Sequence, residues 1–246
     1  MKQVITRTLA AIVLSGAPML SQAVPFTPTG TFGALTGFGS DPFTGDGIPT
    51  DQTMITTFDG FDGDTVTIAL AATQRFKNPA LTNDGAGTYT AQAGLNDGTP
   101  GSTSGSLRST WNFSYFIGID GTGDTTIADL GITLFYDLDP GNGTDSSALG
   151  TFDFFPTISS RQVGGSQNAT FDYLGTGILD VVTAPAFTSF DPLVAGEYSF
   201  AIVSDFASKT ETVAMNVNVT AVPEPASLAL LGLGLVALGY SRRKKA

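Results

Sequence analysis

The stretch Trp111-Asn112-Phe113-Ser114-Tyr115-Phe116-Ile117-Gly118-Ile119, with residues 107–110 before it, decides the fold. An apolar side chain stands at every second position, and the positions between them are mostly small or polar. A period of two residues places each set on its own face of an extended strand. The stretch therefore predicts a β-strand over residues 107–119. Its apolar face carries Trp111, Phe113, Tyr115, Ile117 and Ile119.

The same alternation recurs along the chain, over residues 64–70, 130–138, 196–204 and 212–219. In the last of these, valines and Met215 alternate with Asn216 and Asn218, which predicts that both asparagines point outward. Clusters of Asn, Asp, Gly and Pro separate the runs, as is typical of turns. No run with a helical period of ten or more residues occurs between the two ends of the sequence.

Short strands joined by turns predict an all-β fold. We expect an antiparallel β-sandwich of jelly-roll or immunoglobulin-like type over residues 51–221. Residues 193–200 and 212–219 are expected to form its final hairpin. Residues 24–50 are rich in Gly, Pro, Thr and Phe. This segment is compatible with a loose arm or with a first strand.

Composition narrows the possible chemistry. The chain of 246 residues contains no cysteine and no histidine, which excludes disulfides, thiol chemistry, histidine-based metal sites and a Ser-His-Asp triad. Between residues 24 and 222, five basic side chains face 21 acidic ones, a net charge of −16. Such a domain repels nucleic acid and anionic lipid surfaces, so no nucleic-acid partner is expected.

The first 23 residues have the pattern of a secretory signal peptide. Lys2 and Arg7 form a positive start, residues 9–20 are mostly apolar, and Ser21 and Ala23 are small residues before a cleavage site. We expect export through the Sec machinery and cleavage after Ala23. The alternative is an uncleaved N-terminal helix.

The other end of the sequence has three parts. Pro223, Glu224 and Pro225 precede an apolar run over residues 226–240, and a basic cluster follows, made of Arg242, Arg243, Lys244 and Lys245. As a helix the run is about 22 Å long, short for a hydrocarbon core of about 30 Å. Snorkelling basic side chains make a marginal transmembrane helix feasible, with the cluster on the cytoplasmic side.

This order of parts over residues 222–246 resembles the PEP-CTERM sorting signal. The resemblance implies processing by an exosortase-type membrane protease, with Pro223, Glu224 and Pro225 as recognition residues of a substrate. It also implies export, a transient stay in the inner membrane, and release to the cell surface or the medium. Proteins with this signal are often linked to extracellular polysaccharide and biofilm. The alternative is a plain tail anchor that stays in the membrane.

Two loops are dense in oxygen-bearing side chains. Residues 59–64 hold three aspartates, and the second loop holds Asp137, Asp139, Asn142 and Asp145. Flexible loops of this kind suit calcium, which takes six to eight oxygen ligands, although neither matches the EF-hand pattern. The competing interpretation is that these side chains stabilise their own turns. Calcium is the one cofactor considered, at the second loop.

Trp111 is expected in the core, and the alternative is an exposed platform that stacks on sugars. Glycoside hydrolysis needs two carboxylates across a cleft, and among 21 acids some pair would meet that distance by chance. We therefore expect no enzyme activity. The expected function is that of an exported structural protein associated with the extracellular matrix or biofilm. The alternative is a calcium-stabilised module that binds extracellular polysaccharide.

Overall fold

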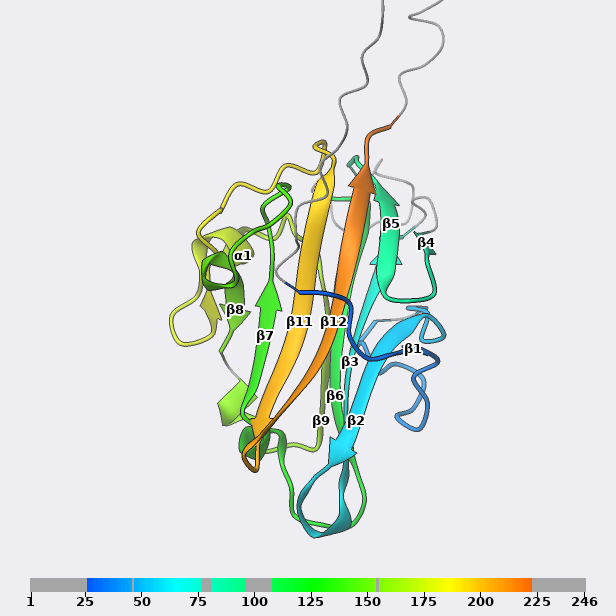
Figure 1. Ribbon diagram of the computed structural model, residues 1–246, viewed down its shortest axis with the longest axis vertical. Coiled ribbons are helices and arrows are strands. Elements are labelled where there is room, and N and C mark those ends of the chain that lie inside the picture. The colour runs from blue at the N-terminus through cyan, green and yellow to red at the C-terminus, as the bar shows by residue number, and fades with distance from the viewer. Residues whose placement is uncertain (1–25, 46, 77–80, 96–107, 154, 223–246) are drawn as a thin grey trace, which may run out of the picture.

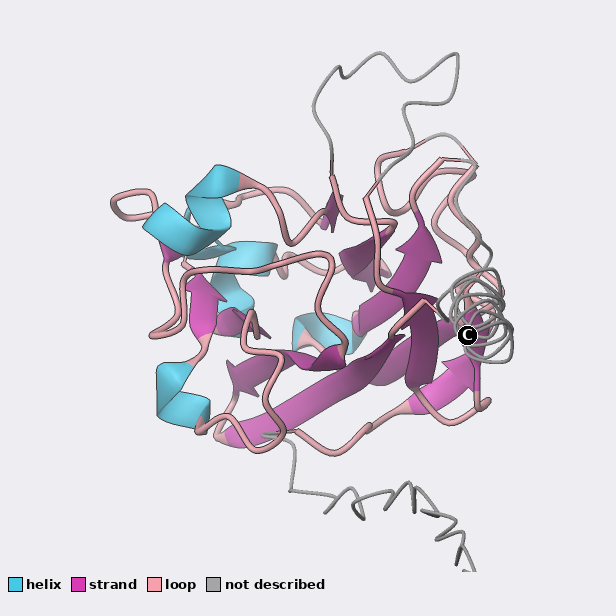
Figure 2. Cartoon of the chain, turned by 90° about the horizontal axis from the view of Figure 1, so that it is seen from above, coloured by secondary structure: helices cyan, strands magenta, loops and turns pink. Residues whose placement is uncertain are grey.

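The computed structural model describes residues 26–45, 47–76, 81–95, 108–153 and 155–222. Within them, two β-sheets pack face to face, and the short helices lie mostly at one side of the sandwich (Figures 1 and 2). The all-β prediction is confirmed at this level, while the jelly-roll or immunoglobulin-like label stays a prediction. In the described part of the chain, no helix is long and apolar enough to cross a membrane. The predicted signal peptide 1–23 and transmembrane helix 226–240 lie outside it.

The first sheet has five strands in the order β1-β2-β3-β6-β9, and every neighbouring pair is antiparallel. Its long central strands correspond to two predicted ones, with different bounds: β3 continues past the predicted end at residue 70, and β6 begins at Trp111 and not at the predicted residue 107. The strands are β1 (Thr31–Gly33), β2 (Thr53–Asp59), β3 (Thr65–Gln74), β6 (Trp111–Asp120) and β9 (Gln162–Gln167).

The second sheet has seven strands in the order β10-β8-β7-β11-β12-β5-β4. The predicted final hairpin is its centre, where Gly196 pairs with Val219 and Phe206 with Lys209. The strands are β4 (Thr82–Asn83), β5 (Thr88–Gln92), β7 (Ile132–Tyr136), β8 (Gly150–Phe152), β10 (Val182–Thr183), β11 (Gly196–Phe206) and β12 (Lys209–Thr220).

The prediction of a wholly antiparallel sandwich is wrong at one pair, because β5 runs parallel to β12. A local turn fixes the direction of a hairpin partner, as it does for β4 and β5. The pairing of Thr88 with Asn216 joins segments more than a hundred residues apart, so no turn in the sequence signals its direction. Short helical turns occupy connections elsewhere: η1 (Phe61–Gly63), η2 (Ile127–Leu130), η3 (Ser146–Ala148), η4 (Phe155–Thr157) and α1 (Asp172–Thr176).

The core forms where the apolar face of β6 meets β11 and β12. Trp111 is 1% exposed, and its ring lies 5.7 Å from that of Tyr198 between centroids. Phe113 stacks on Phe200 at 4.5 Å. Burial of each such side chain contributes roughly 1.5–3 kcal/mol. The core position predicted for Trp111 is confirmed, and the sugar-platform alternative is wrong, since the ring is enclosed between the sheets.

The outer face of the first sheet is not the polar surface that the alternation indicated. Phe116, Ala69 and Ala71 are fully buried on that face, under Leu35 and Phe43. Of the two alternatives for residues 24–50, the first strand is confirmed, and the described part of the segment is not a loose arm, because it packs on the sheet. It contributes the short strand β1 and then crosses the sheet as a cover.

Close contact between cover and sheet requires small residues on the sheet. A β-carbon at Gly164 would lie 1.9 Å from the backbone oxygen of Pro42, so no other residue fits there without displacing the cover. Phe38 of the cover packs on Phe116 with ring centroids 4.8 Å apart. Gly164 of β9 thus allows the first sheet to carry a second apolar cluster on its outer side.

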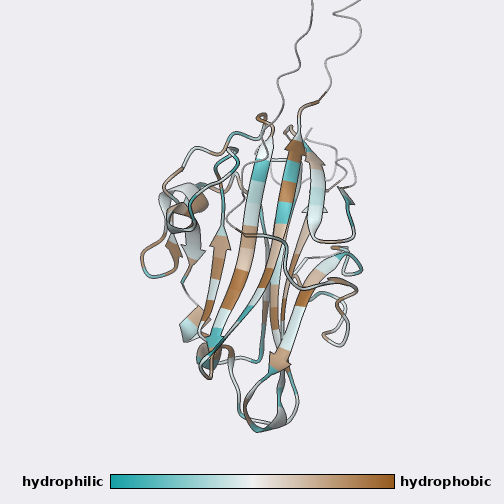
Figure 3. Cartoon of the chain, in the orientation of Figure 1, coloured by the Kyte–Doolittle hydropathy of each residue, from teal (hydrophilic) through white to brown (hydrophobic). Residues whose placement is uncertain are grey.

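Asn216 points outward from β12 as predicted, but it is only 3% exposed. It is hydrogen-bonded with Ser199 on β11 at 3.0 Å, and Phe26 packs on Phe135 on the same face. Thr29 also bridges to Ala214. The start of the described chain thus covers part of this face, while Asn218 stays exposed. Figure 3 shows the alternation of polar and apolar residues along β12.

An ion pair between a buried aspartate and a partly exposed arginine joins three connections at the end of the sandwich opposite the end of β12. Asp64 is 1% exposed, and its carboxylate accepts hydrogen bonds from Arg161 at 2.8 and 3.0 Å. It also accepts from the backbone N–H groups of Gly123 and Thr125. The hydrogen bonds from Arg161 are the main cause that holds the pKa of Asp64 well below its usual range. Residues 60–64, 121–125 and 161 are thereby fixed to one another.

We expect Asp64→Asn to lower the midpoint of urea unfolding at pH 7 and to weaken the loss of stability in acid. An unfolded aspartate has a pKa of about 3.9. Because the folded pKa lies below that value, the stabilisation is present above about pH 4 and is lost as the pH falls through the folded pKa. Unfolding curves from pH 7 to pH 2 measure both effects. The control is Asp62→Asn, an exposed aspartate of the same loop; equal losses for the two variants would contradict a stabilising role for the pair.

Candidate functional site

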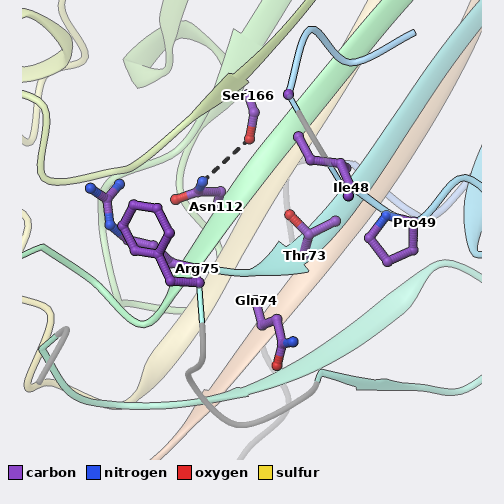
Figure 4. A pocket seen from close by; sticks show the side chains of 10 residues that line it. Ile48, Pro49, Thr73, Gln74, Arg75, Asn112 and Ser166 are labelled. Atoms are coloured by element: carbon purple, nitrogen blue, oxygen red, sulfur yellow. Dashed lines mark hydrogen bonds between the residues drawn. The ribbon is translucent and has the colours of Figure 1, made fainter. Parts of the chain in front are cut away.

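A groove lies on the outer side of the first sheet, between the cover segment and the ends of β3, β6 and β9. It consists of two adjoining hollows of about 430 and 140 Å³, which share Pro49, Thr73 and Gln74. We call it the outer groove. Figure 4 shows Thr73 between the cover residues on one side and Asn112 on the other. Its principal lining residues are Ile48, Pro49, Gln52, Thr73, Gln74, Arg75, Phe76, Leu81, Asn112 and Ser166.

The floor of the outer groove is polar and held in place by hydrogen bonds. Asn112 donates to the hydroxyl of Ser166 at 3.3 Å (Figure 4). The side-chain carbonyl of Asn112 accepts from Asn168 at 2.7 Å. Asn168 is fully buried and also donates to the backbone oxygens of Ser109 and Trp111. The floor therefore presents amide and hydroxyl groups whose orientation is fixed before any ligand arrives, which reduces the entropy lost on binding.

One wall of the outer groove carries an aromatic ring in an unusual backbone conformation. Phe76 is 51% exposed and has a φ of 53°, in the left-handed region that costs a residue with a side chain roughly 1–2 kcal/mol. The guanidinium of Arg75 lies 4.7 Å from the centre of the Phe76 ring. This contact stabilises the exposed ring at the mouth of the groove, because a cation over an aromatic face is attracted to it.

The charge of the outer groove differs from that of the rest of the domain. None of the described residues that line the groove is acidic. By contrast, the sequence from residue 24 to residue 222 contains 21 carboxylates. Arg75 supplies a positive charge, and burial and the nearby charge of Arg108 lower the pKa of Arg75. The described lining of the groove thus carries one basic and no acidic side chain, within an acidic domain. Its amide and hydroxyl groups can hydrogen-bond hydroxyl groups of a ligand.

The structure does not gather the predicted calcium residues around one point. Asp137 accepts a hydrogen bond from the backbone of Asp139, Asp139 accepts from Gly141, and Asp145 accepts from Ser147. These are turn contacts within each loop segment. Among the described residues, no three acidic side chains form a group that could hold a metal ion. Calcium at Asp137, Asp139, Asn142 and Asp145 stays a prediction without support from this geometry.

In the first aspartate-rich loop, residues 59–64, a carboxylate binds other groups of the protein. Its last carboxylate, that of Asp64, is bound by Arg161 and by two backbone N–H groups. Arg161 lies 97 positions further along the chain, so no local pattern indicated that the two side chains would meet. The loop therefore has a structural role at the end of the sheet, and a calcium site there is not supported.

The predicted processing residues lie outside the described part of the chain. They are Ala23 at the N-terminal end and Pro223, Glu224, Pro225, Arg242, Arg243, Lys244 and Lys245 at the C-terminal end. The described chain leads to the second group without a spacer. Thr220 is the last residue of β12, its carbonyl accepts a hydrogen bond from Ala93, and only Ala221 and Val222 follow before the Pro-Glu-Pro motif.

Sequence reasoning did not find the outer groove. Its floor comes from Asn112 and Ser166, which are 54 positions apart, and its wall from the irregular segment around Ile48. The one available signal was Arg75, because basic residues are rare between residues 24 and 222. No pattern in the sequence showed that this arginine stands beside an exposed aromatic ring.

The fold and the C-terminal sequence define the class of protein, a β-sandwich domain joined directly to a C-terminal sorting segment. Residues 221–244 match the family model of the PEP-CTERM protein-sorting motif, which confirms the identification of the tail from its sequence. The match covers 24 of 246 residues and leaves the β-sandwich unassigned. No curated protein and no solved structure matches the chain. The motif supports export, transient membrane anchoring and processing by an exosortase-type membrane enzyme.

Asp137 provides a test of the second aspartate-rich loop. Burial raises its pKa to about 6, although the hydrogen bond from Asp139 opposes that shift. The folded chain therefore keeps a proton that the unfolded chain releases above about pH 4, so stability falls as the pH rises from about 4 to about 6. We expect Asp137→Asn to raise stability at pH 7 by up to about 3 kcal/mol and to change little near pH 4.

Chemical unfolding of both proteins at pH 4, 5, 6 and 7 measures this difference. A repeat with millimolar calcium, and another with EDTA, tests the metal. A bound calcium ion would favour the ionised carboxylate and raise the stability of the original protein alone. A constant difference between the two proteins across the whole pH range would contradict the raised pKa.

Proposed function

We propose that this chain is an exported, exosortase-processed protein with a structural, non-catalytic role in the extracellular matrix or biofilm, and that its outer groove holds a segment of matrix polysaccharide. The sorting motif supports the location outside the cell. The observation that carries the proposal is the chemistry of the outer groove. It combines fixed amides and hydroxyls, apolar walls and one arginine, without a carboxylate among its described lining residues.

Polysaccharides suit this lining. A sugar ring has hydroxyl groups around its rim, which match Asn112, Ser166 and Thr73, and an apolar C–H face, which matches the exposed ring of Phe76. The groove continues from the larger hollow into the smaller one past Thr73 and Gln74, which suits a linear chain. The described lining of the groove has no carboxylate that would repel an anionic ligand, so within this acidic domain the groove is the place where we expect polysaccharides with carboxylate groups to bind.

A holding role fits this lining better than hydrolysis does. Glycoside hydrolysis uses two carboxylates about 5–10 Å apart, one on each side of the scissile bond. The described lining of the groove offers no such pair. The calcium-stabilised alternative would require the carboxylates of residues 137–145 to converge, and these carboxylates contact their own turns instead.

Mass spectrometry of the native protein, taken from culture medium and cell envelope, tests the processing. The expected mature form begins near Val24 and ends near Pro223, because cleavage at these points removes the signal and the membrane segment. The released chain would keep β12 complete. A folded cytosolic protein with both ends intact would contradict the proposal.

Binding of a defined uronate polymer tests the outer groove. We expect the mature protein to bind polygalacturonate in isothermal titration calorimetry and to bind neutral dextran more weakly. Phe76→Ala should weaken binding up to about tenfold, since loss of an aromatic contact costs about 0.5–1.5 kcal/mol.

Phe187→Ala is the matched control, because Phe187 is 37% exposed and lies outside the groove. Its affinity should equal that of the original protein. Equal losses in both variants, or no binding to either polymer, would count against the groove as a polysaccharide site.

A further inference from the structure

Three exposed apolar side chains lie at the end of the sandwich where the chain continues into the sorting tail. Leu193 is 63% exposed, Val194 41% and Val222 56%. We call them the apolar rim. Water-exposed leucine and valine are common singly, but a group of them at one end of a domain marks a contact surface.

The pairing of the strands places the members of the rim at the same end. Gly196, the first residue of β11, pairs with Val219 near the end of β12. Residues 93 and 94 connect the loop before β11 with the end of β12. Gly94 donates to the carbonyl of Pro192 at 2.7 Å, and Ala93 donates to the carbonyl of Thr220 at 2.8 Å. In Figure 1, the loop before β11 and the last described residues lie together above the β12 arrowhead.

The turn that carries Leu193 is fixed by its own hydrogen bonds. The carboxylate of Asp191 accepts from the backbone N–H of Leu193 at 2.9 Å, and the carbonyl of Asp191 accepts from Val194 at 3.1 Å. These contacts use the carboxylate of Asp191 inside the turn and leave both apolar side chains at its tip. Their exposure is thus a property of the folded turn.

The tail sets the distance between the rim and the membrane. Five residues separate Thr220, the end of β12, from Ala226, where the apolar run begins. Fully extended, they reach about 18 Å. The headgroup zone on one side of a bilayer takes about 5–8 Å of that length. While the tail is inserted, this end of the sandwich is therefore held within about 10–13 Å of the lipid surface, the length of three or four extended residues.

We propose that the apolar rim rests on the lipid surface while the sorting tail is inserted in the bilayer. The proposal depends on the membrane insertion of the tail and not on what the outer groove binds. Three side chains are too few to bind a membrane alone. The short tether makes their contact intramolecular and raises their effective concentration at the surface. Once the tail is cleaved, the rim loses this advantage and the domain leaves the membrane.

The absence of cysteine allows a clean test with the full chain. Leu193→Cys carries a single environment-sensitive fluorophore, and the protein is reconstituted into phosphatidylcholine vesicles with a fraction of nitroxide-labelled lipid. Leu179→Cys is the matched control, because Leu179 is 88% exposed in the loop between α1 and β10. Flotation of the vesicles shows separately whether the tail is inserted.

We expect several-fold stronger quenching at position 193 than at position 179 in the floated protein. We also expect quenching at 193 to disappear when the chain is cut after Val222. Equal quenching at the two positions in floated protein would overturn the rim proposal and leave the proposed function untouched. A chain that does not float would overturn the rim proposal together with membrane anchoring, and binding to polygalacturonate would still be measurable.

Discussion

The packing of β6 against β11 determines the rest of the structure. β6 is the only described strand that combines a row of five large apolar side chains on one face with a buried phenylalanine on the other. Its inner face joins the two sheets through Trp111 and Phe113. Its outer face requires a second apolar layer over Phe116, because an exposed patch there would be costly. The cover segment supplies that layer, and the outer groove is the space left where the cover ends beside β3, β6 and β9.

Alternation made the long strands predictable. Over residues 196–204 and 212–219, and from residue 111 onward in the predicted stretch 107–119, the side-chain period alone predicted both the strand and its inward face, because local geometry dictates the period of two. Asn216 shows where this reasoning ends. The period of two correctly predicted that Asn216 points outward. Another segment of the chain covers that face, and the alternation of side chains along β12 does not indicate such a cover. Phe116 also points outward from its strand and is covered by another segment. Because it is a large apolar residue on an outer face, it was the one feature of the sequence that indicated the cover.

Long-range pairs were beyond sequence reasoning for a different reason. The parallel alignment of β5 with β12, the ion pair of Asp64 with Arg161, and the contact of Asn112 with Ser166 join residues 54 to 128 positions apart. Their geometry is set by the topology of the two sheets. The composition of the aspartate-rich loops therefore predicted calcium sites. In the structure, their carboxylates bind a distant arginine or nearby backbone N–H groups. The tail was predictable because its signal is local and consists of ordered, adjacent parts.

The position of β12 has a consequence for the order of folding during export. β12 is the last strand of the described chain, yet it lies between β11 and β5 inside the seven-stranded sheet. The first sheet is complete once β9 has crossed the membrane, but β5 has only β4 beside it, and lacks β12, until nearly the whole chain has passed through. Pairing across so long a stretch of sequence is slow compared with local hairpins. On the proposed route the tail enters the membrane only after β12 has crossed. It then holds the domain at the membrane until cleavage, which gives the second sheet time to close before release.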